Sequence, residues 1–346
     1  MPLKLTWRRV ASLAPLLIAL LLAGCGNTSL NDINHTPNLL DPQSPVALAE
    51  SNLFWVILVV ATFVFVVVIA ALLYSIVRFR SRPGAPEPVQ THGNTQIEIA
   101  WTIAPSIVLV LVLIGTIYTM FEVQQPAAQN TITVNAIGHQ WWWEFQYPDQ
   151  HIVTADEMYI PTNTVVHLNL VSNNVIHSFW VPQLTGKTDV IPGHNNAMWI
   201  ESNSVGWYRG LCAEFCGTQH AHMDFLVHAV SSSDYQAWVS QQQQQAAQPT
   251  DALAQQGAKY FAASACIGCH AINGVTTTNP ASLIGPNLTH FGGRQWIAGG
   301  VTDNTPANLA AWLKDPQAVK NGSDMPNLHL TDDQVNELVA YLESLK

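Results

Sequence analysis

Charged residues are scarce in this chain: Asp, Glu, Lys and Arg make up only 10% of its 346 residues, whereas hydrophobic residues make up 48%. A composition this poor in charge indicates that part of the chain does not lie in water. The net charge of −10 also lacks the basic excess that a nucleic-acid-binding surface requires. No glycine-rich nucleotide motif stands where a strand would run into a helix. We therefore expect no nucleic-acid partner and no nucleotide chemistry, and the length predicts two or three domains.

Cysteine is also rare, with five in the chain, and the first of them ends an apolar leader. Basic residues precede the apolar run VASLAPLLIALLLA, which is shorter than a typical membrane span. Residues 1–24 are therefore predicted to be an export signal, followed by an exported segment over 25–50. The sequence LAGC that ends at Cys25 resembles the bacterial lipobox, which implies cleavage before Cys25 and lipid attachment to its sulfur. The alternative is a signal anchor in which this cysteine is incidental.

Two long uncharged runs predict a transmembrane hairpin over residues 51–122. Residues 51–77 and 99–121 each exceed the roughly 20 residues needed to cross the hydrocarbon core, and neither run has a polar face. The connection between them carries several arginines directly after the first run. Because arginine-rich loops remain in the cytoplasm, Cys25 and everything after residue 122 are expected on the outer side of a bacterial cell membrane.

The rest of the chain divides into two soluble domains of different character. Residues 130–235 contain short alternating segments separated by Pro, Gly, Asn and Asp, which is typical of a β-sandwich or Greek-key barrel. The sequence QQQQQAAQPT predicts a polar linker over residues 240–250. Residues 251–346 are predicted to be helices joined by Gly- and Pro-rich loops, and the last helix is expected to begin after an N-cap at Thr331. The predicted fold is therefore a transmembrane hairpin, then a β domain, then an all-α domain.

The all-α domain contains the sequence CIGCH, which is the C-x-x-C-H motif for covalent attachment of c-type haem. Cys266 and Cys269 would bond the porphyrin vinyl groups, and His270 would bind the iron. A redox C-x-x-C pair expects a βαβ setting, which this helical segment lacks. A zinc knuckle expects a second cysteine pair, and no cysteine follows Cys269. The motif therefore favours haem c.

The sixth iron ligand is predicted to be Met325, because it is the only methionine in this domain and a Met/His pair suits a haem that transfers electrons. His290 and His329 are the rival ligands. The domain resembles class I cytochromes c, which supply an axial methionine from a loop before the last helix. The segment GPNLTHFGGR resembles the haem-covering segment of that family, which implies that Arg294 and Trp296 meet the haem propionates.

The segment LCAEFCGTQHAHMDF, residues 211–225, gathers a second set of ligand side chains. A disulfide between Cys212 and Cys216 is permitted outside the cell but leaves His220 and Met223 unexplained. Zinc would use the thiolates and the imidazole but has little use for a thioether. Copper accepts all three ligand types, and two thiolates can bridge two copper ions. Each ion then needs a terminal imidazole, of which His220 supplies one and a distant segment must supply the other.

The chain resembles subunit II of the haem–copper cytochrome c oxidases, with a fused cytochrome c, over nearly its whole length. The segments IHSFWVP and GLCAEFCGTQHAHM match those that carry the copper ligands in that family. The resemblance implies a cupredoxin domain with a binuclear copper A centre. The implied ligands are the bridging thiolates of Cys212 and Cys216, the imidazoles of His177 and His220, the thioether of Met223 and the backbone carbonyl of Glu214. It also implies that the Glu214 carboxylate helps to hold magnesium at the border with subunit I.

Two further segments match the family. In GHQWWWEFQY, Trp141 stands where the family accepts electrons from cytochrome c, although this chain has Trp142 where tyrosine is usual. The alternative is that these tryptophans only pack at the domain surface. In IEIAWT, Glu98 stands where the family places a glutamate at the entrance of a proton-uptake channel, and otherwise it is an ordinary charge at a helix boundary. His222 and Asp224 depart from the family pattern, and His222 is not expected to be a ligand.

The resemblance implies the electron-input subunit of a respiratory terminal oxidase that reduces O₂ to water and pumps protons. Electrons from cytochrome c or another donor would enter at haem c, pass to copper A, and leave to subunit I, which holds haem a and copper B. Subunit III is a further expected partner, and the oxygen-reducing site lies on another subunit. The alternatives are the electron-input subunit of a copper A-containing nitric oxide reductase, and a membrane-anchored copper carrier or structural zinc module.

Overall fold

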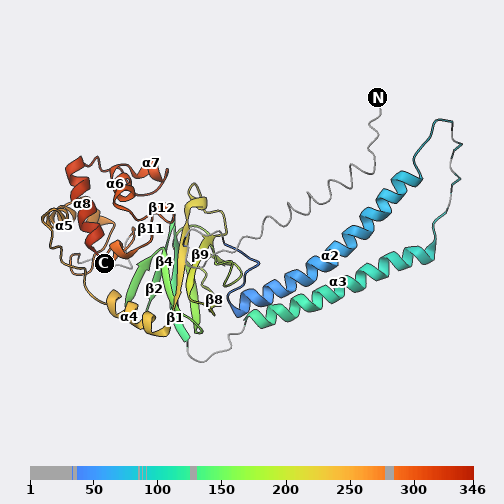
Figure 1. Cartoon of the computed structure of the whole chain (residues 1–346), viewed down its shortest axis with the longest axis horizontal. Coiled ribbons are helices and arrows are strands. Elements are labelled where there is room, and N and C mark those ends of the chain that lie inside the picture. Colours follow the sequence, from blue (N-terminus) through green and yellow to red (C-terminus); the bar gives the residue numbers. More distant parts are fainter. Residues whose placement is uncertain are drawn as a thin grey trace, which may run out of the picture.

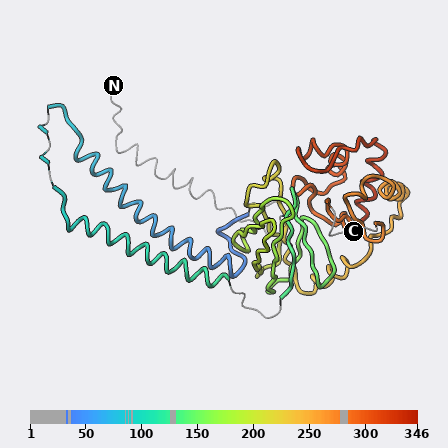
Figure 2. Tube along the Cα trace, turned by 180° about the vertical axis from the view of Figure 1, so that it is seen from behind, coloured from blue at the N-terminus to red at the C-terminus, as the bar shows by residue number. Residues whose placement is uncertain are grey.

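The computed structural model describes residue 33 and residues 37–84, 86–87, 89–90, 92–124, 131–276 and 284–346. The predicted leader, residues 1–24, and the predicted lipidation site Cys25 lie outside the described residues. Two long helices extend side by side away from a pair of packed domains (Figure 1). The view from behind shows the β domain between this hairpin and the C-terminal domain (Figure 2).

The hairpin consists of α2 (Pro45–Arg78) and α3 (Thr95–Gln124), and both helices are long and apolar enough to cross a membrane. Helix α2 begins earlier than the predicted span because its first turn belongs to the β domain. The Ser44 side chain caps α2 by accepting a hydrogen bond from the Ala47 amide, and its hydroxyl donates to Leu184 O at 2.6 Å. At the end of α3, Val123 O accepts a hydrogen bond from the Trp199 indole at 2.9 Å. Both helices are thus anchored to the β domain at the same end.

The β domain is a sandwich of two five-stranded sheets, as predicted. The first sheet has the order β3 (Ile152–Ala155), β2 (Trp142–Tyr147), β1 (Thr131–His139), β5 (Val165–Ser172), β8 (Asn196–Ile200). The second has the order β4 (Glu157–Pro161), β10 (Asp224–Val230), β9 (Gly206–Cys212), β6 (His177–Trp180), β7 (Thr188–Val190). Strands β1 and β5 are parallel in the first sheet, and strands β4 and β10 are parallel in the second.

Aromatic side chains fill the space between the sheets. Trp143, Phe179 and Phe225 are fully buried, and their rings lie 4.7–5.6 Å apart. Gly210 faces the Phe225 ring so closely that a Cβ there would lie 2.1 Å from the ring. A closely packed interior resists movement of the loops that leave it, so the ends of β6 and β9 are held in fixed positions.

The segment predicted as a linker is ordered at both ends. Helix α4 (Ser232–Gln242) continues the β domain past residue 235, because Trp238 stacks on Tyr159 at 4.7 Å between ring centroids. Ala246, in the middle of the predicted linker, is buried in the core of the C-terminal domain. The polar composition indicated a free tether, but only a few residues separate the packing of the two domains.

The C-terminal domain is helical, with the addition of one short two-stranded ribbon that the sequence did not predict. Its elements are α5 (Ala252–Ala263), η2 (Ala265–Gly268), η4 (Phe291–Gly293), β11 (Trp296–Ile297), β12 (Thr302–Asp303), α6 (Pro306–Lys314), α7 (Pro316–Val319) and α8 (Asp332–Ser344). Thr331 caps α8 and forms a capping box with Gln334, which confirms the expected start of the last helix. Helices α5 and α8 cross at Gly257, where a Cβ would lie 2.0 Å from Glu337 O.

Candidate functional site

The segment 211–225 becomes a ligand cluster because two neighbouring strands deliver its parts to one end of the sandwich. Strand β9 ends at Cys212, which pairs with Phe179 of β6. Strand β6 begins at His177, so this distant histidine lies beside the end of β9. The chain then turns through Cys216 and the short helix η1 (His220–His222) before β10. The sandwich therefore supplies the second imidazole that the segment itself lacks.

The sulfur and nitrogen atoms of this cluster lie at ligand-sharing distances. Cys212 Sγ and Cys216 Sγ are 3.8 Å apart, which excludes a disulfide at about 2.05 Å in this structure. His177 Nδ1 lies 3.8 Å from Cys212 Sγ, and His220 Nδ1 lies 3.7 Å from Cys216 Sγ. Met223 Sδ completes the set at 3.8 Å from Cys216 Sγ. Each thiol thus has its own imidazole, as expected for two bridging thiolates with two terminal nitrogens.

The backbone of Glu214 joins the same cluster. The Cys212 thiol donates to Glu214 O at 3.3 Å, so this carbonyl oxygen faces the ligand atoms. The Glu214 side chain is exposed and lies beside Phe215, which is 74% exposed. The two functional groups of Glu214 therefore face different directions, one toward the cluster and one toward the surface.

His222 stands between two of the ligand residues in the sequence but bonds elsewhere. Its Nδ1 lies 2.6 Å from Gln219 Oε1, and its side chain is exposed. The structure thus separates His222 from the cluster, as predicted from the sequence.

The two thiols are placed so that they can release their protons when a soft metal ion binds. The two sulfur atoms lie within hydrogen-bonding distance of each other, and this interaction lowers the pKa of Cys212 well below its usual range. The same interaction, together with burial, raises the pKa of Cys216. Both thiol protons would leave when a metal ion binds, because the thiolate is the form that acts as a ligand. With buried soft sulfur ligands, imidazoles and a thioether, the donor set fits copper better than zinc.

Two residues behind His177 fix its ring and were not identified from the sequence. His177 Nε2–H donates to Asn174 Oδ1 at 3.0 Å, which leaves the Nδ1 lone pair directed at the cluster. On the other side, a Cβ at Gly138 would lie 2.7 Å from His177 Cδ2. Asn174 stands three positions before His177, but nothing in the sequence relates Gly138 to this ring.

We expect Gly138→Ala to weaken copper binding by about 10–100-fold, the range seen when an outer-shell partner of a metal ligand is changed. The added methyl group would displace the His177 ring without removing a ligand. The measurement is a copper titration of the purified protein followed by absorption of the bound metal. Gly293→Ala is the matched control, because a Cβ there meets nothing within 4 Å. Equal affinity in the two variants would contradict the role of Gly138.

The haem motif lines an apolar cavity in the C-terminal domain. Cys266, Cys269, His270 and Met325 all face it, which brings the predicted haem residues together. The remaining wall is mainly apolar and includes Leu288, Phe291, Trp312 and Leu328. Arg294 and Trp296, expected beside the haem propionates, also line the cavity. Thiols, an imidazole and a thioether around one apolar cavity are a donor set that fits haem c.

His270 is oriented for a metal by the segment opposite to it. Its Nδ1 lies 2.8 Å from Pro286 O, so Nδ1–H donates to this carbonyl and Nε2 is left free. A Cβ at Gly285 would lie 2.7 Å from the His270 ring. Burial lowers the pKa of His270, which keeps the imidazole neutral and able to bind iron.

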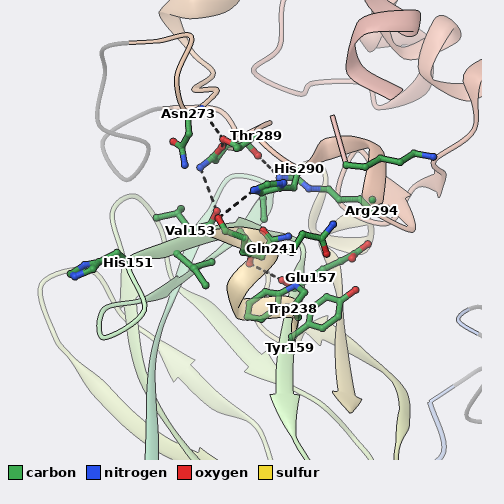
Figure 3. Close-up of a pocket in the computed structure, with 17 residues that line it drawn as sticks. His151, Val153, Glu157, Tyr159, Trp238, Gln241, Asn273, Thr289, His290 and Arg294 are labelled. Atoms are coloured by element: carbon green, nitrogen blue, oxygen red, sulfur yellow. Dashed lines mark hydrogen bonds between the residues drawn. The ribbon is translucent and has the colours of Figure 1, made fainter. Parts of the chain in front are cut away.

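The rival ligand His290 faces a different cavity. That cavity lies between β3, α4 and the C-terminal domain, and His290 is among its lining side chains (Figure 3). Its Nε2–H donates to Gln242 O at 3.2 Å. His329, the other rival, is not among the residues that line the haem cavity. The geometry therefore favours Met325 as the sixth ligand.

A buried carboxyl group connects the two domains beside this second cavity. Glu157 Oε1 accepts a hydrogen bond from the Gln295 amide of the C-terminal domain, and Arg294 lies nearby (Figure 3). Burial raises the pKa of Glu157 to about 7. A carboxyl whose pKa is raised on folding stabilises the folded state below its unfolded pKa, and this stabilisation is lost as the pH rises through the folded pKa.

We expect the melting temperature of the protein to fall between pH 5 and pH 7.5 because Glu157 becomes charged in this window. The decline should be smaller in Glu157→Gln, which keeps an oxygen acceptor but cannot ionise. Asp156, whose pKa burial raises to about 6, leaves part of the decline in place. The comparison is thermal unfolding of both proteins across this pH range. Parallel curves for the two would show that Glu157 is not the titrating group.

The haem cavity and the ligand cluster meet at Trp141. This tryptophan lines the haem cavity together with Trp142 of the β domain. Its indole N–H also donates to Cys216 O at 3.0 Å, and Gln140 Nε2 donates to the same oxygen at 2.8 Å. One side chain therefore contacts both the cavity of the haem motif and a residue of the ligand cluster.

Glu98 lies far from both centres. It stands in the first turn of α3, at the end of the hairpin opposite to the two packed domains (Figure 1). Helix α3 has 30 residues and therefore extends over about 45 Å. Glu98 thus lies at one end of the hairpin, and the domain that carries the ligand cluster is packed at the other end.

Comparison with known proteins gives matches to each part of this architecture. A model of the transmembrane domain of cytochrome c oxidase subunit II matches residues 33–118, and a model of its periplasmic domain matches residues 151–230. A cytochrome c model matches residues 254–346.

Curated relatives match nearly the whole chain. Cytochrome c oxidase subunit 2 of Alkalihalophilus pseudofirmus is 38% identical over 98% of this chain and 98% of that protein. The protein of the same name from Bacillus sp. (strain PS3) is 36% identical over 95% of each. Quinol oxidase subunit 2 of Bacillus subtilis (strain 168) is 30% identical over 68% of this chain and 72% of that protein.

Proposed function

Because this chain belongs to the family of cytochrome c oxidase subunit II and carries a C-terminal cytochrome c domain, we propose that it passes electrons from a covalent haem c through copper A to the haem of subunit I. The chain is a subunit of an oxidoreductase complex. Oxygen would be reduced to water on subunit I, which would hold haem a and copper B.

The observation that carries this proposal is the position of Trp141. It lines the haem cavity and donates its indole N–H to Cys216 O, so one aromatic side chain and one residue of the copper loop (residues 211–225) would connect the two centres. A short covalent and hydrogen-bonded route of this kind suits electron transfer and has no use in hydrolysis. In this chain Trp141 would receive electrons from the attached haem domain.

The protein holds the copper ligands in a rigid and dry environment. Cys212, Cys216 and Met223 are buried, and His177 is fully enclosed. When bound, binuclear copper would take up one electron at a time and share it between two ions. The sandwich resists displacement of the ligand side chains on that change of charge, because β6 and β9 leave a packed aromatic core.

The C-terminal domain would hold the haem through four side chains. Cys266 and Cys269 would attach the haem, while His270, held by Pro286 O, and Met325 would bind its iron. A Met/His pair favours a higher reduction potential, which suits a haem that receives electrons from cytochrome c or another upstream donor. Arg294 offers a positive charge for the propionates from the wall of the cavity.

The remaining assignments concern the surroundings of the complex. The exposed Glu214 carboxylate would help to hold magnesium at the contact with subunit I, and subunit III would be a further partner. Glu98 would serve proton uptake at the cytoplasmic end of the hairpin as protons are pumped. Both soluble domains would lie on the outer side of the bacterial cell membrane, where Cys25 would carry lipid.

Two other functions use parts of the same site. An electron-input subunit of a copper A-containing nitric oxide reductase would share both centres and would differ only in the partner subunit. A membrane-anchored copper carrier or structural zinc module would need the cluster but not the haem cavity joined to it through Trp141. The matches to cytochrome c oxidase subunit 2 over nearly the whole chain favour the oxidase. The quinol oxidase relatives cover a smaller part of the chain.

The test is a rapid-mixing experiment on the purified complex with oxygen and with nitric oxide as alternative oxidants. Reduced cytochrome c is mixed with the complex, and the haem c and copper A absorption bands are followed separately. We expect haem c to be reduced first, copper A second, and oxygen to be consumed. Turnover with nitric oxide alone would favour the reductase, and a metal cluster that is never reduced would favour the carrier or the zinc module.

A further inference from the structure

A buried lysine lies between the two centres, and neither centre uses it as a ligand. Lys320 follows α7 in the haem domain and is only 4% exposed. Burial lowers its pKa to about 8, so the ammonium group remains charged at neutral pH. Charged lysines are almost never buried without partners, because removing the charge from water is costly. The buried ammonium group of Lys320 therefore needs partners that offset the cost of removing it from water.

The partners of Lys320 belong to both domains. Its Nζ donates to Trp141 O in the β domain at 2.7 Å and to Ala298 O in the haem domain at 2.8 Å. The carboxylates of Asp156 and Asp224 add attraction from the β domain. Lys320 thus binds the main chain of the same tryptophan whose indole N–H donates to Cys216 O.

The neighbouring turn of the haem domain approaches the same place. Gly299 has a φ of +69°, and a Cβ there would lie 2.7 Å from Lys320 Nζ, 2.9 Å from Trp141 O and 3.1 Å from His222 O. Gly299 O also accepts a hydrogen bond from the Asp224 amide at 3.1 Å. Gln219 of the copper loop donates to Asn321 O, one position after Lys320. The haem domain therefore contacts Trp141 and both ends of the turn that carries His220 and Met223.

The two residues that depart from the family pattern lie at this contact. His222 contributes its backbone at the close approach of Gly299, and Asp224 contributes its amide to Gly299 O and its charge to the surroundings of Lys320. Both residues belong to the surface on which the haem domain rests. A free cytochrome would bind and leave such a surface, whereas the fused domain is held there by buried groups.

We propose that Lys320 is a positioning residue for electron transfer between the two centres, which holds Trp141 against the haem cavity and fixes the haem domain on the copper loop. This inference rests on the proposed function, because it concerns the rate at which an electron passes from haem c to copper A. Its positive charge also favours the reduced state of a centre next to it, since the reduced centre carries one electron more.

The test is the rate of electron transfer inside the intact oxidase complex after a flash-activated ruthenium reductant reduces haem c. We expect Lys320→Met to slow the transfer several-fold, because the buried carbonyls of Trp141 and Ala298 lose their shared donor and the contact between the two domains loosens. The midpoint potential of copper A should also fall, since a nearby positive charge is lost. Lys314→Met is the matched control, because Lys314 lies on α6 of the same domain and pairs with the exposed Asp332. This control should transfer electrons at the normal rate.

A second variant separates position from charge. Gly299→Ala keeps the lysine and its charge but places a methyl group against Lys320 Nζ, Trp141 O and His222 O. We therefore expect slower transfer with a copper A potential that falls less than in Lys320→Met. A normal rate in Lys320→Met with full haem and copper content, or an equal loss in Lys314→Met, would overturn the proposal. If Lys320→Met does not assemble, a normal rate in Gly299→Ala overturns it. An unmodified complex that binds both cofactors but shows no transfer would instead contradict the proposed function itself.

Discussion

Replacing Cys216 by serine is expected to remove binuclear copper A and to reduce electron delivery to subunit I by more than about a hundredfold. Cys216 Sγ is the atom around which the cluster is arranged, because the sulfur atoms of Cys212 and Met223 and the His220 imidazole all lie within 3.8 Å of it. Changes to groups that only orient a metal ligand already cost about 10–100-fold. Loss of a bridging ligand should therefore cost more than that.

The measurement combines copper content with the rate of oxygen consumption by the complex. Haem c should remain attached and reducible, because its ligands lie in the other domain. His222→Ala is the control within the same loop, since this histidine bonds to Gln219. Full copper content in Cys216→Ser would disprove the assignment of the cluster, and loss of copper in His222→Ala would show that a ligand has been missed.

The second large effect is expected at the sixth ligand of haem c. Met325→His should lower the midpoint potential of haem c by on the order of 0.2 V, within the range of about 0.8 V that axial ligands determine. For a one-electron couple this corresponds to roughly a thousandfold change in the equilibrium between the two centres. The haem would then be much harder to reduce, so the upstream donor could no longer deliver electrons to it effectively, and oxygen consumption should nearly stop.

Potentiometric titration of the haem c band measures this shift directly. His329→Gln is the control, because His329 lies near Met325 in the chain but is not among the residues that line the haem cavity. We expect its potential to match that of the unmodified protein. A large shift in His329→Gln together with a small one in Met325→His would identify the histidine as the ligand.

The sequence predicted most of the fold because the strong signals are local. Long apolar runs indicated the helices α2 and α3, short alternating segments indicated the sandwich, and Thr331 with Gln334 determined the start of α8. Where local composition was misleading, tertiary packing was the cause. Helix α2 begins at Pro45 because Ser44 is bound to the β domain. The polar segment after α4 is ordered because Ala246 is buried in the haem domain.

The ligand residues could be predicted for a similar reason, but the residues that orient them could not. Cysteine, histidine and methionine at close spacing have few other uses in one exported segment, so the chemistry of the site is visible in the sequence. The groups that hold the ligands are ordinary residues from distant segments. Gly138 lies behind His177 across two sheets, and Lys320 reaches Trp141 over a separation of 179 residues. Only the folded arrangement shows these contacts.

On this proposal, one chain holds both a binuclear copper centre and a haem c, which are joined through Trp141. Elemental analysis combined with electron paramagnetic resonance of the purified full-length protein measures the content and the type of both centres. We predict two copper ions and one iron ion per chain, with the spectrum of a single unpaired electron shared by two equivalent copper nuclei. One zinc ion without copper, or a spectrum from an electron on one copper nucleus alone, would contradict the claim.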